Sequence, residues 1–387
     1  MSSSLVTFIV PIYNKEQHLR ECIDSIAAQT LPDIEILCVD NNSSDGSVAI
    51  VEEMMSADPR IRLLHETEQG LPQARNCGMA AATGEYIAFV DADDFVDPRL
   101  AELTVDSARC CGSDVVLFPF ADNRLDPDKF KKVWARKLPR PGVRALDLGA
   151  DLSLYFTPSV WSKLFKRDFL ESNNLLFDPE LKQAEDVLFS YSAIVSAACL
   201  SQVCDPPLYF YRRRVAGSMI SDRSSVEQSF MALKAYDKLD HWLQVNGKKD
   251  DFEAAFLRKL LSEIEYTFDL TDDFEAFRCY FDEYRHRYAD AFSSEAAKTL
   301  QSLPMYRTYI ASRDFDEAMF LRSKRAKRSF DEERHRNDEA IRKAKKKRDR
   351  LKMEKERIQG SRVYKYARRA EVLSKAFPFS KKGTGKK

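Results

Sequence analysis

The feature that most constrains this chain is an apolar run that stops abruptly at a cluster of acids, in the sequence EYIAFVDADDFVDP at residues 85–98. The run Tyr86–Val90 is short, apolar and bounded by a glycine and a proline, which predicts a fully buried strand. The acids that follow, among them Asp91 and Asp93, then stand at the carboxyl end of that strand. In an open α/β sheet, this is the edge where ligands bind.

Carboxylates this close together repel one another, and a divalent cation relieves the repulsion because hard cations prefer oxygen ligands. The alternative is a solvated acidic turn, in which Asp97 caps a helix that starts at Pro98. Taken alone, the pair Asp91 and Asp93 favours the turn, because such short motifs are common by chance. The surrounding sequence is needed to choose between the two.

A length of 387 residues indicates two or three domains with a large core. No apolar run is long enough to cross a bilayer, and residues 1–14 lack the basic region and cleavage site of a signal peptide. The eight cysteines form no C-x-x-C pair and mostly have apolar neighbours. We therefore expect buried free thiols in a reducing cytoplasm, and neither a zinc site nor a disulfide framework.

The zero net charge hides a strong polarity along the chain. Residues 321–387 hold 26 Lys and Arg against 9 Asp and Glu, a net charge of +17, which leaves −17 on the rest. An acidic body with a basic tail predicts an anionic partner for the tail, either a membrane surface or nucleic acid.

The first 120 residues alternate apolar strand patterns with single amphipathic helices. This order implies βαβ units and a mainly parallel, doubly wound α/β sheet. Strands are expected at residues 5–12, 34–39, 61–64, 86–90 and 114–118, and helices at 15–29, 47–55, 71–82 and 98–111. The sequence has neither G-x-G-x-x-G after the first strand nor a P-loop motif, which argues against a dinucleotide or P-loop site.

Three of these strand ends carry side chains suited to a nucleotide. The first strand ends at Tyr13, the second at Asp40, and the fourth at Asp91 and Asp93. An aromatic ring, a lone acid and a metal-competent pair of acids match a base, its edge or ribose, and a diphosphate.

The segments VPIYN, ILCVDNNSSDGS, QARNCG and FVDADD, in this order, resemble the N-terminal signature of the family 2 glycosyltransferases with the GT-A fold. The likeness is close over about the first 120 residues and looser to about residue 220. Within the family, the chain is similar to the bacterial surface-polysaccharide branch. It implies that Pro11 and Tyr13 line the nucleobase, that Asp40 bonds its edge, usually uracil, and that Arg75 lies near the nucleotide. From the residues alone, the alternative for Arg75 is a solvent-facing helix residue, and the alternative for Tyr13 is a core aromatic at the end of a strand.

The same resemblance makes Asp91, Ala92 and Asp93 the D-x-D motif that meets the donor. It implies Mg²⁺ or Mn²⁺ as the cofactor, held by Asp93 and by Asp91. One position departs from the usual pattern: the family commonly reads VDDGS, whereas here Asn41 follows Asp40. Asn41 keeps hydrogen-bonding capacity but loses a charge.

The acceptor half is expected after Phe120. Residues 121–149 are polar and proline-containing, which predicts an irregular, non-sheet excursion. The segment around Trp161 and Lys163 resembles W-x-K-L-F-K-R stretches of the same branch. Trp161 then floors the sugar pocket and Lys163 faces phosphate or acceptor; the alternative is a core tryptophan beside a solvated lysine.

Glu185 and Asp186 open a predicted helix and match the family's E-D-x-x-F element, which makes Asp186 the catalytic base. Glu185 is expected to orient acceptor or donor. A helix start favours a carboxylate through the helix dipole, so ordinary helix-start acids are the alternative. Three arginines follow the strand pattern at 208–211, and the resemblance assigns one of them, Arg213, to the diphosphate.

The remaining sequence predicts helices from about residue 224 to 323, with aromatic stripes typical of a packing core. A long solvated helix, a basic amphipathic segment and a disordered end follow. The expected domains are 1–220, 221–321 and 322–387. Within the first of them, residues 1–120 are expected to bind the nucleotide sugar and residues 121–220 the acceptor.

The expected function is that of an inverting glycosyltransferase. It moves a sugar from a nucleotide-diphospho-sugar, usually a UDP-sugar, to a hydroxyl of a glycan or lipid-linked acceptor in surface-polysaccharide assembly. The basic tail would hold it on the inner face of the cell membrane, and nucleic acid is not the expected partner. The rivals are a nucleotidyltransferase, which needs a Gly-rich basic loop that is missing after the first strand, and a non-catalytic scaffold whose tail binds membrane or RNA.

Overall fold

A computed structural model of the chain describes residues 4–123, 131–132, 144–146, 157–212, 226–270, 274–312, 315–319, 321–323, 327, 343 and 346. The chain forms two compact units, Met1–Phe315 and Asp316–Lys387, and nearly all of the described residues belong to the first. Most of the predicted basic extension, 322–387, lies outside the described residues. Of the helices in the described stretches, none is long and apolar enough to span a membrane.

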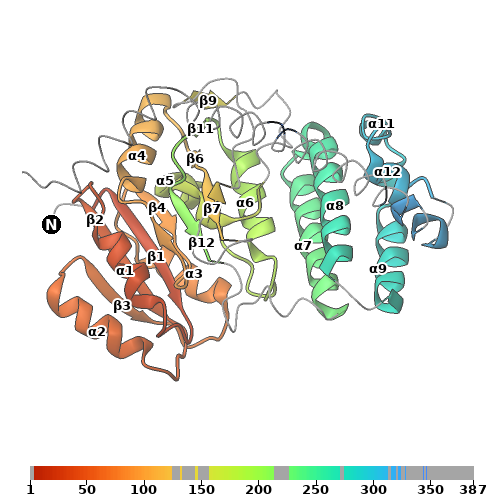
Figure 1. The fold of residues 1–387 in the computed structure, drawn as a ribbon. Coiled ribbons are helices and arrows are strands. Elements are labelled where there is room, and N and C mark those ends of the chain that lie inside the picture. The colour runs from red at the N-terminus through yellow and green to blue at the C-terminus, as the bar shows by residue number, and fades with distance from the viewer. Residues whose placement is uncertain are drawn as a thin grey trace, which may run out of the picture. The chain divides into compact units, whose positions relative to one another are not determined.

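Among the described residues, eight strands form the main sheet, in the order β3-β2-β1-β4-β10-β6-β11-β9 (Figure 1). Their bounds are β1 (Val6–Ile12), β2 (Ile34–Asp40), β3 (Ile61–His65), β4 (Tyr86–Phe89), β6 (Val115–Leu117), β9 (Arg144–Leu146), β10 (Lys163–Lys166) and β11 (Leu200–Gln202). The first four run parallel, whereas β10 lies antiparallel between β4 and β6. The predicted α/β class with a mainly parallel sheet is confirmed.

Helices cover both faces of this sheet, which explains why its central strands are apolar on both sides. On one face, alternate residues of β1 such as Phe8 and Val10 pack against apolar side chains of α1 (Leu19–Ala27), α2 (Ser47–Ala57) and α4 (Leu100–Cys111). On the other, Ile9 packs so closely on Gly78 of α3 (Leu71–Ala81) that a Cβ there would lie 2.4 Å from its Cγ2. Phe89 meets Phe177 and Phe189 on that second face.

A second, smaller sheet lies beside the acidic end of β4. Its described strands have the order β5-β12-β7-β8 and the bounds β5 (Phe95–Val96), β12 (Tyr209–Tyr211), β7 (Phe120–Asp122) and β8 (Lys131–Lys132). The prediction of a non-sheet excursion over 121–149 is wrong where β7 ends and at β8 and β9. These strands are two or three residues long, which is too short to leave a periodic signal in the sequence.

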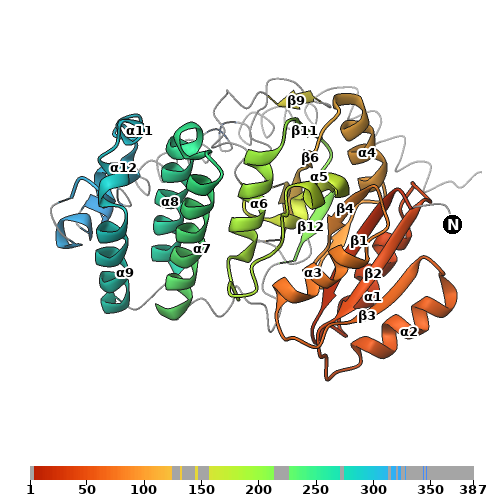
Figure 2. The ribbon, with the colours of Figure 1, turned by 180° about the vertical axis from the view of Figure 1, so that it is seen from behind.

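Two short helices complete the mixed region: α5 (Arg167–Ser172) and α6 (Glu185–Ser196). The helical region follows, and both views place α7 next to α6 and α8 next to α7 (Figure 2). Its bounds are α7 (Val226–Val245), α8 (Lys249–Leu270), α9 (Phe274–Arg287), α10 (Ala289–Phe292), α11 (Glu295–Lys298) and α12 (Pro304–Tyr309). The aromatic stripes, including Phe256, Phe281 and Tyr284, are buried, which confirms their prediction as a packing core.

The cysteines only partly follow expectation. All eight are free thiols, but burial is complete only for Cys22 and Cys38, while Cys110 and Cys279 are exposed. Both exposed cysteines lie on helices, where an apolar neighbour in sequence points to a different side of the helix.

Candidate functional site

The predicted strand ends meet at one edge of the sheet. Strand β1 pairs in parallel with β2 and with β4, and Ile12 lies opposite Asp40 in the register. The amide of Asn41 donates to the carbonyl of Ile12 at 2.8 Å, so the chain leaves β1 and β2 at the same level. The loops after β1, β2 and β4 therefore share this edge.

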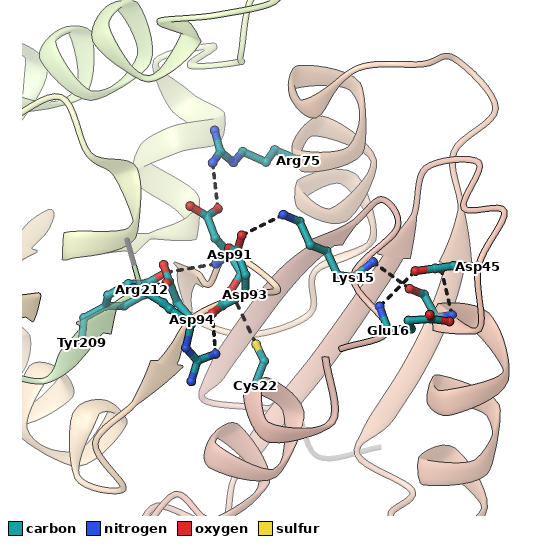
Figure 3. Close-up of polar contacts among 11 residues, drawn as sticks. Lys15, Glu16, Cys22, Asp45, Arg75, Asp91, Asp93, Asp94, Tyr209 and Arg212 are labelled. Carbon is teal, nitrogen blue, oxygen red and sulfur yellow. Dashed lines mark hydrogen bonds and ion pairs between the residues drawn. The ribbon is translucent and has the colours of Figure 1, made fainter. Parts of the chain in front are cut away.

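The acidic loop, Asp91–Asp94, is fixed in shape by its last residue. The buried carboxylate of Asp94 accepts from the Tyr209 hydroxyl at 2.7 Å and from the Arg212 amide at 2.6 Å (Figure 3). The same hydroxyl accepts from the Asp91 amide at 3.2 Å. Burial raises the pKa of Asp94 well above its usual value, and the neighbouring acids add to the rise. Asp94 thus anchors the loop and leaves the other two carboxylates for the edge.

Arg75 ties the acidic loop to helix α6. It is only 2% exposed, and its guanidinium contacts Asp91 Oδ1 at 3.1 Å and Glu185 Oε1 at 2.6 Å. It also lies over the ring of Phe177, with its Cζ 5.2 Å from the centroid. Burial raises the pKa of the Asp91 carboxyl, and the Arg75 charge opposes that rise. The alternative of a solvent-facing arginine is wrong, because the side chain bridges two segments 94 residues apart.

Lys15 makes the second ionic contact to the acidic loop. Its Nζ lies 2.7 Å from Asp93 Oδ2, and both side chains are partly exposed, at 20% and 14%. Its amide donates to Ser47 Oγ at 2.9 Å, which fixes the backbone on the neighbouring loop. Sequence reasoning missed Lys15, although its place directly after the end of β1 puts a cation at the same edge as the acids.

The carboxylate oxygens at this edge are suitable ligands for a divalent cation that binds together with a diphosphate. Asp91 and Asp93 offer carboxylate oxygens, and the ammonium of Lys15 already occupies a cation position on Asp93. Within the described residues, no three His, Cys, Asp or Glu side chains gather so as to hold a metal alone. One or two carboxylates completed by substrate phosphates and water are the usual magnesium set, and the pair matches it.

The predicted base-binding residues line the same edge. Tyr13 is 51% exposed just after β1, so the alternative of a core aromatic is wrong. Asp40 is buried at the end of β2, where Oδ1 accepts from the Ser43 amide at 3.2 Å and Oδ2 lies 3.5 Å from His65 Nδ1. Pro11 is a buried residue of β1 itself, and Ala92 is buried within the acidic loop.

Helix α6 begins at this site. Ala184 precedes it in a left-handed conformation, with φ 57°, and the first turn carries Glu185 and Asp186. Glu185 is buried against Arg75, whereas Asp186 is partly exposed and close enough for its charge to act on Arg75 and Lys163. The carboxylate of Glu185 therefore has a structural role in the site, and the carboxylate of Asp186 remains accessible to solvent.

The comparisons with known proteins decide the family. The sequence profile described as Glycosyl transferase family 2 matches residues 7–171. The protein EpsH of Bacillus subtilis (strain 168) is 31% identical over 261 residues, which make up 65% of this chain and 73% of EpsH. The chain belongs to glycosyl transferase family 2.

A further relative is a glycosyltransferase, and a solved structure shares the fold. EpsJ of Bacillus subtilis (strain 168), an uncharacterized glycosyltransferase, is 37% identical over 210 residues. The matched segment makes up 54% of this chain and 61% of EpsJ. The solved structure of Staphylococcus aureus TarS 1-349, in complex with UDP-GlcNAc, superposes with a TM-score of 0.51 at 22% identity. It covers 73% of this chain and 92% of that one, and it confirms the predicted GT-A fold.

The departure of this family 2 chain from the VDDGS pattern has a structural reason. The Asn41 amide group donates to the carbonyls of Glu66 and Glu68 at 3.0 and 2.7 Å, and its oxygen accepts from the Gly70 amide at 2.8 Å. An aspartate cannot make the two donations. Asn41 thereby fastens the end of β2 to the loop that leads into α3, the helix that carries Arg75.

Asn41→Asp is therefore expected to destabilise the fold by about 1–3 kcal/mol, because the carbonyls of Glu66 and Glu68 lose their donor and face a carboxylate at a buried position. The measurement is urea unfolding of both proteins. Asn76→Asp tests the same change at a site with one such donation, to the carbonyl of Phe177 at 2.8 Å, and should cost less. Equal stability of Asn41→Asp and the parent would contradict the assigned bonds.

The remaining predicted residues of this family 2 domain divide into three cases. Trp161 stacks on Tyr209 and Tyr211, and its ring centroid lies 4.5 Å from the first and 5.2 Å from the second. Trp161 is therefore packed among aromatic rings, and its role as the floor of the sugar pocket stays a prediction. Lys163 is fully buried, which makes the alternative of a solvated lysine wrong. Arg213 lies outside the described residues.

Lys163 donates to the carbonyls of Thr157 and Ser159 at 2.8 and 2.6 Å, and burial lowers its pKa to about 7. Arg212 is the one of the three predicted arginines that lies within the described residues. Its guanidinium donates to the carbonyl of Asp93 at 2.8 Å and pairs with Glu21 at 2.9 Å.

Proposed function

We propose that the chain transfers a sugar, with inversion, from a UDP-sugar to a hydroxyl of a glycan or lipid-linked acceptor in the assembly of a cell-surface polymer. The observation that carries the proposal is the bridge made by Arg75. It places the D-x-D loop and the helix start with Glu185 and Asp186 at one buried cation. A donor diphosphate held at the loop and an acceptor hydroxyl next to α6 would then be neighbours.

In this proposal the donor lies across the sheet edge, with its base against Tyr13 and Asp40 and its diphosphate towards the acidic loop. Pro11, Arg75, Ala92, Trp161, Lys163 and Arg213 are the further residues proposed to shape or bind the donor. Arg75 acts on the donor by holding Asp91 in place. Mg²⁺ or Mn²⁺ at Asp93 and Asp91 would supply positive charge to the leaving diphosphate.

The proposed chemistry is a single displacement at the anomeric carbon. Asp186 takes the proton of the acceptor hydroxyl while its oxygen bonds to that carbon from the face opposite the diphosphate. The bond from the anomeric carbon to the diphosphate oxygen breaks, and the nucleoside diphosphate leaves with the electron pair. The first turn of α6 favours the ionised form of Asp186, and the buried Glu185 keeps that turn against Arg75.

Two relatives support a surface polymer as the acceptor. TarS of Staphylococcus aureus (strain MW2), a poly(ribitol-phosphate) beta-N-acetylglucosaminyltransferase, is 28% identical over 66% of this chain and 44% of its own length. A poly(ribitol-phosphate) beta-glucosyltransferase of Bacillus spizizenii is 31% identical over 54% of this chain and 32% of its own. Attachment of residues 322–387 to the inner membrane face remains a component of the proposal.

The test is calorimetric binding of a panel of nucleotide sugars, with Mg²⁺, Mn²⁺ or EDTA. We expect one UDP-sugar to bind with metal, and Asp93→Ala to weaken that binding on the order of 100-fold, because a metal ligand is lost. Asp282→Ala is the matched control, since it removes an exposed acid on α9. If no nucleotide sugar binds with any metal, the transferase proposal fails and the scaffold alternative replaces it.

A further inference from the structure

The contact between Lys15 and Asp93 joins a cation of the protein to the carboxylate proposed to hold the metal. We infer that Lys15 is a built-in counter-ion that holds Asp93 until metal and nucleotide arrive together, and that it makes the two bind cooperatively. The metal takes over Asp93, and the diphosphate takes over the released ammonium. This inference rests on the proposed function, because it assumes a metal and a diphosphate at this edge.

The position of Lys15 is built by its backbone. Asn14 stands just before it with φ 51°, in the left-handed region, and its Oδ1 accepts from the Ser44 amide at 2.8 Å. Beyond it, the amide of Glu16 donates to Asp45 Oδ2 at 3.1 Å, and Glu16 Oε2 accepts from the Gly46 amide at 2.7 Å (Figure 3). With the bond from the Lys15 amide to Ser47, this turn is fastened to the loop after β2 on both sides of the lysine. The ammonium is therefore delivered to the acidic loop by a fixed turn.

In the described part of the chain, the other two cations that contact the acidic loop bind groups other than the Asp93 carboxylate. Arg75 pairs with Asp91 and Glu185, and Arg212 donates to the backbone carbonyl of Asp93 and to Glu21. Within the described stretches of the chain, Lys15 is thus the cation in ion-pair contact with the Asp93 carboxylate. Its removal leaves that carboxylate to a metal without changing the partner of Asp91.

The cooperativity follows from the charges. An ammonium 2.7 Å from Oδ2 covers one oxygen of the carboxylate and repels an approaching divalent cation. A diphosphate supplies negative oxygens close by, which compensate the ammonium once it leaves Asp93. Metal alone must displace Lys15 without compensation, whereas metal with a nucleoside diphosphate need not. By linkage, each of the two ligands then raises the affinity for the other by the same factor.

The experiment measures Mn²⁺ binding to the full chain by the electron paramagnetic resonance signal of free Mn²⁺, with and without UDP. We expect Lys15→Met to bind Mn²⁺ about tenfold more tightly than wild type when UDP is absent. We also expect UDP to raise the Mn²⁺ affinity of wild type by a larger factor than that of Lys15→Met. Lys298→Met is the matched control, since it removes a lysine paired with Glu295 on α11 and should behave as wild type.

The outcomes separate this inference from the function on which it rests. If Asp93→Ala abolishes Mn²⁺ binding but Lys15→Met and wild type bind Mn²⁺ equally and respond equally to UDP, the metal site stands and the role of Lys15 is overturned. If wild type binds no Mn²⁺ even with UDP, the result contradicts the proposed metal site and, with it, the proposed role of Lys15. Lys15→Gln, checked for native circular dichroism, repeats the test should the methionine variant fold poorly.

Discussion

Replacing Asp186 with asparagine is expected to lower kcat by about 10²–10⁴-fold and to leave the dissociation constant of the donor unchanged. Asparagine keeps the size of the side chain but cannot accept the proton of the acceptor hydroxyl. Donor binding survives because the contacts of the loop, from Arg75 to Asp91 and from Lys15 to Asp93, do not involve Asp186. The measurements are UDP release from the donor identified in the binding panel, and calorimetry of the same donor.

The control for this change is Asp168→Asn, which alters an exposed acid in the first turn of α5, a second helix start on the same unit. It should retain the kcat of the parent. If Asp186→Asn turns over within threefold of wild type, Asp186 is not the base. Weaker donor binding with unchanged kcat would instead place it among the donor contacts.

Replacing Arg75 with methionine is expected to lower the free energy of unfolding by about 3–5 kcal/mol. The guanidinium is buried between Asp91 and Glu185, and methionine fills similar space without charge, so two carboxylates would remain without their cation. The pKa of Asp91 is already raised by burial and would rise further. A raised carboxyl pKa means that the folded state binds more protons than the unfolded one, so the loss should be larger at pH 7 than at pH 5.

Two variants make the interpretation of Arg75→Met specific. Arg75→Met with Glu185→Gln should recover some of the loss, because one of the uncompensated charges is gone. Arg20→Met breaks an exposed pair with Glu53 and should cost less than about 1 kcal/mol. Urea unfolding followed by circular dichroism gives all four stabilities. A cost for Arg75→Met that equals that of Arg20→Met would show that the bridge carries no stability.

The features of the site that the sequence predicted are those set by one strand or helix and its end. An apolar run that stops at Asp91, or a strand that ends at Asp40, places the acid at the sheet edge once the strands are parallel. The start of α6 at Glu185 was visible for the same reason, since acids gather at helix starts. The family signature then supplied the order of these elements along the chain.

The features that could not be predicted depend on partners far away in sequence. Lysine side chains are usually exposed. Lys163 is nevertheless buried, because its strand β10 is inserted antiparallel between β4 and β6. Its ammonium finds acceptors only because residues 157–159 fold back over it. Likewise, nothing local reveals that Arg75 faces Glu185, because the pairing depends on how α3 and α6 pack on the sheet.

The anchoring of Asp94 by Tyr209 has a consequence for the growing chain on the ribosome. The two residues are 115 positions apart, and the pair Arg75 and Glu185 spans 110. The parallel strands β1 to β4 can assemble as soon as residue 90 has emerged, but the acidic loop acquires its shape only after β12 has been synthesised. Closing loops of this length is slow. The four N-terminal strands of a nascent protein can thus pair well before the acidic loop is anchored, whereas β10, β11 and the binding site are completed late in synthesis. We therefore expect an incomplete chain that ends before β12 not to bind a nucleotide sugar.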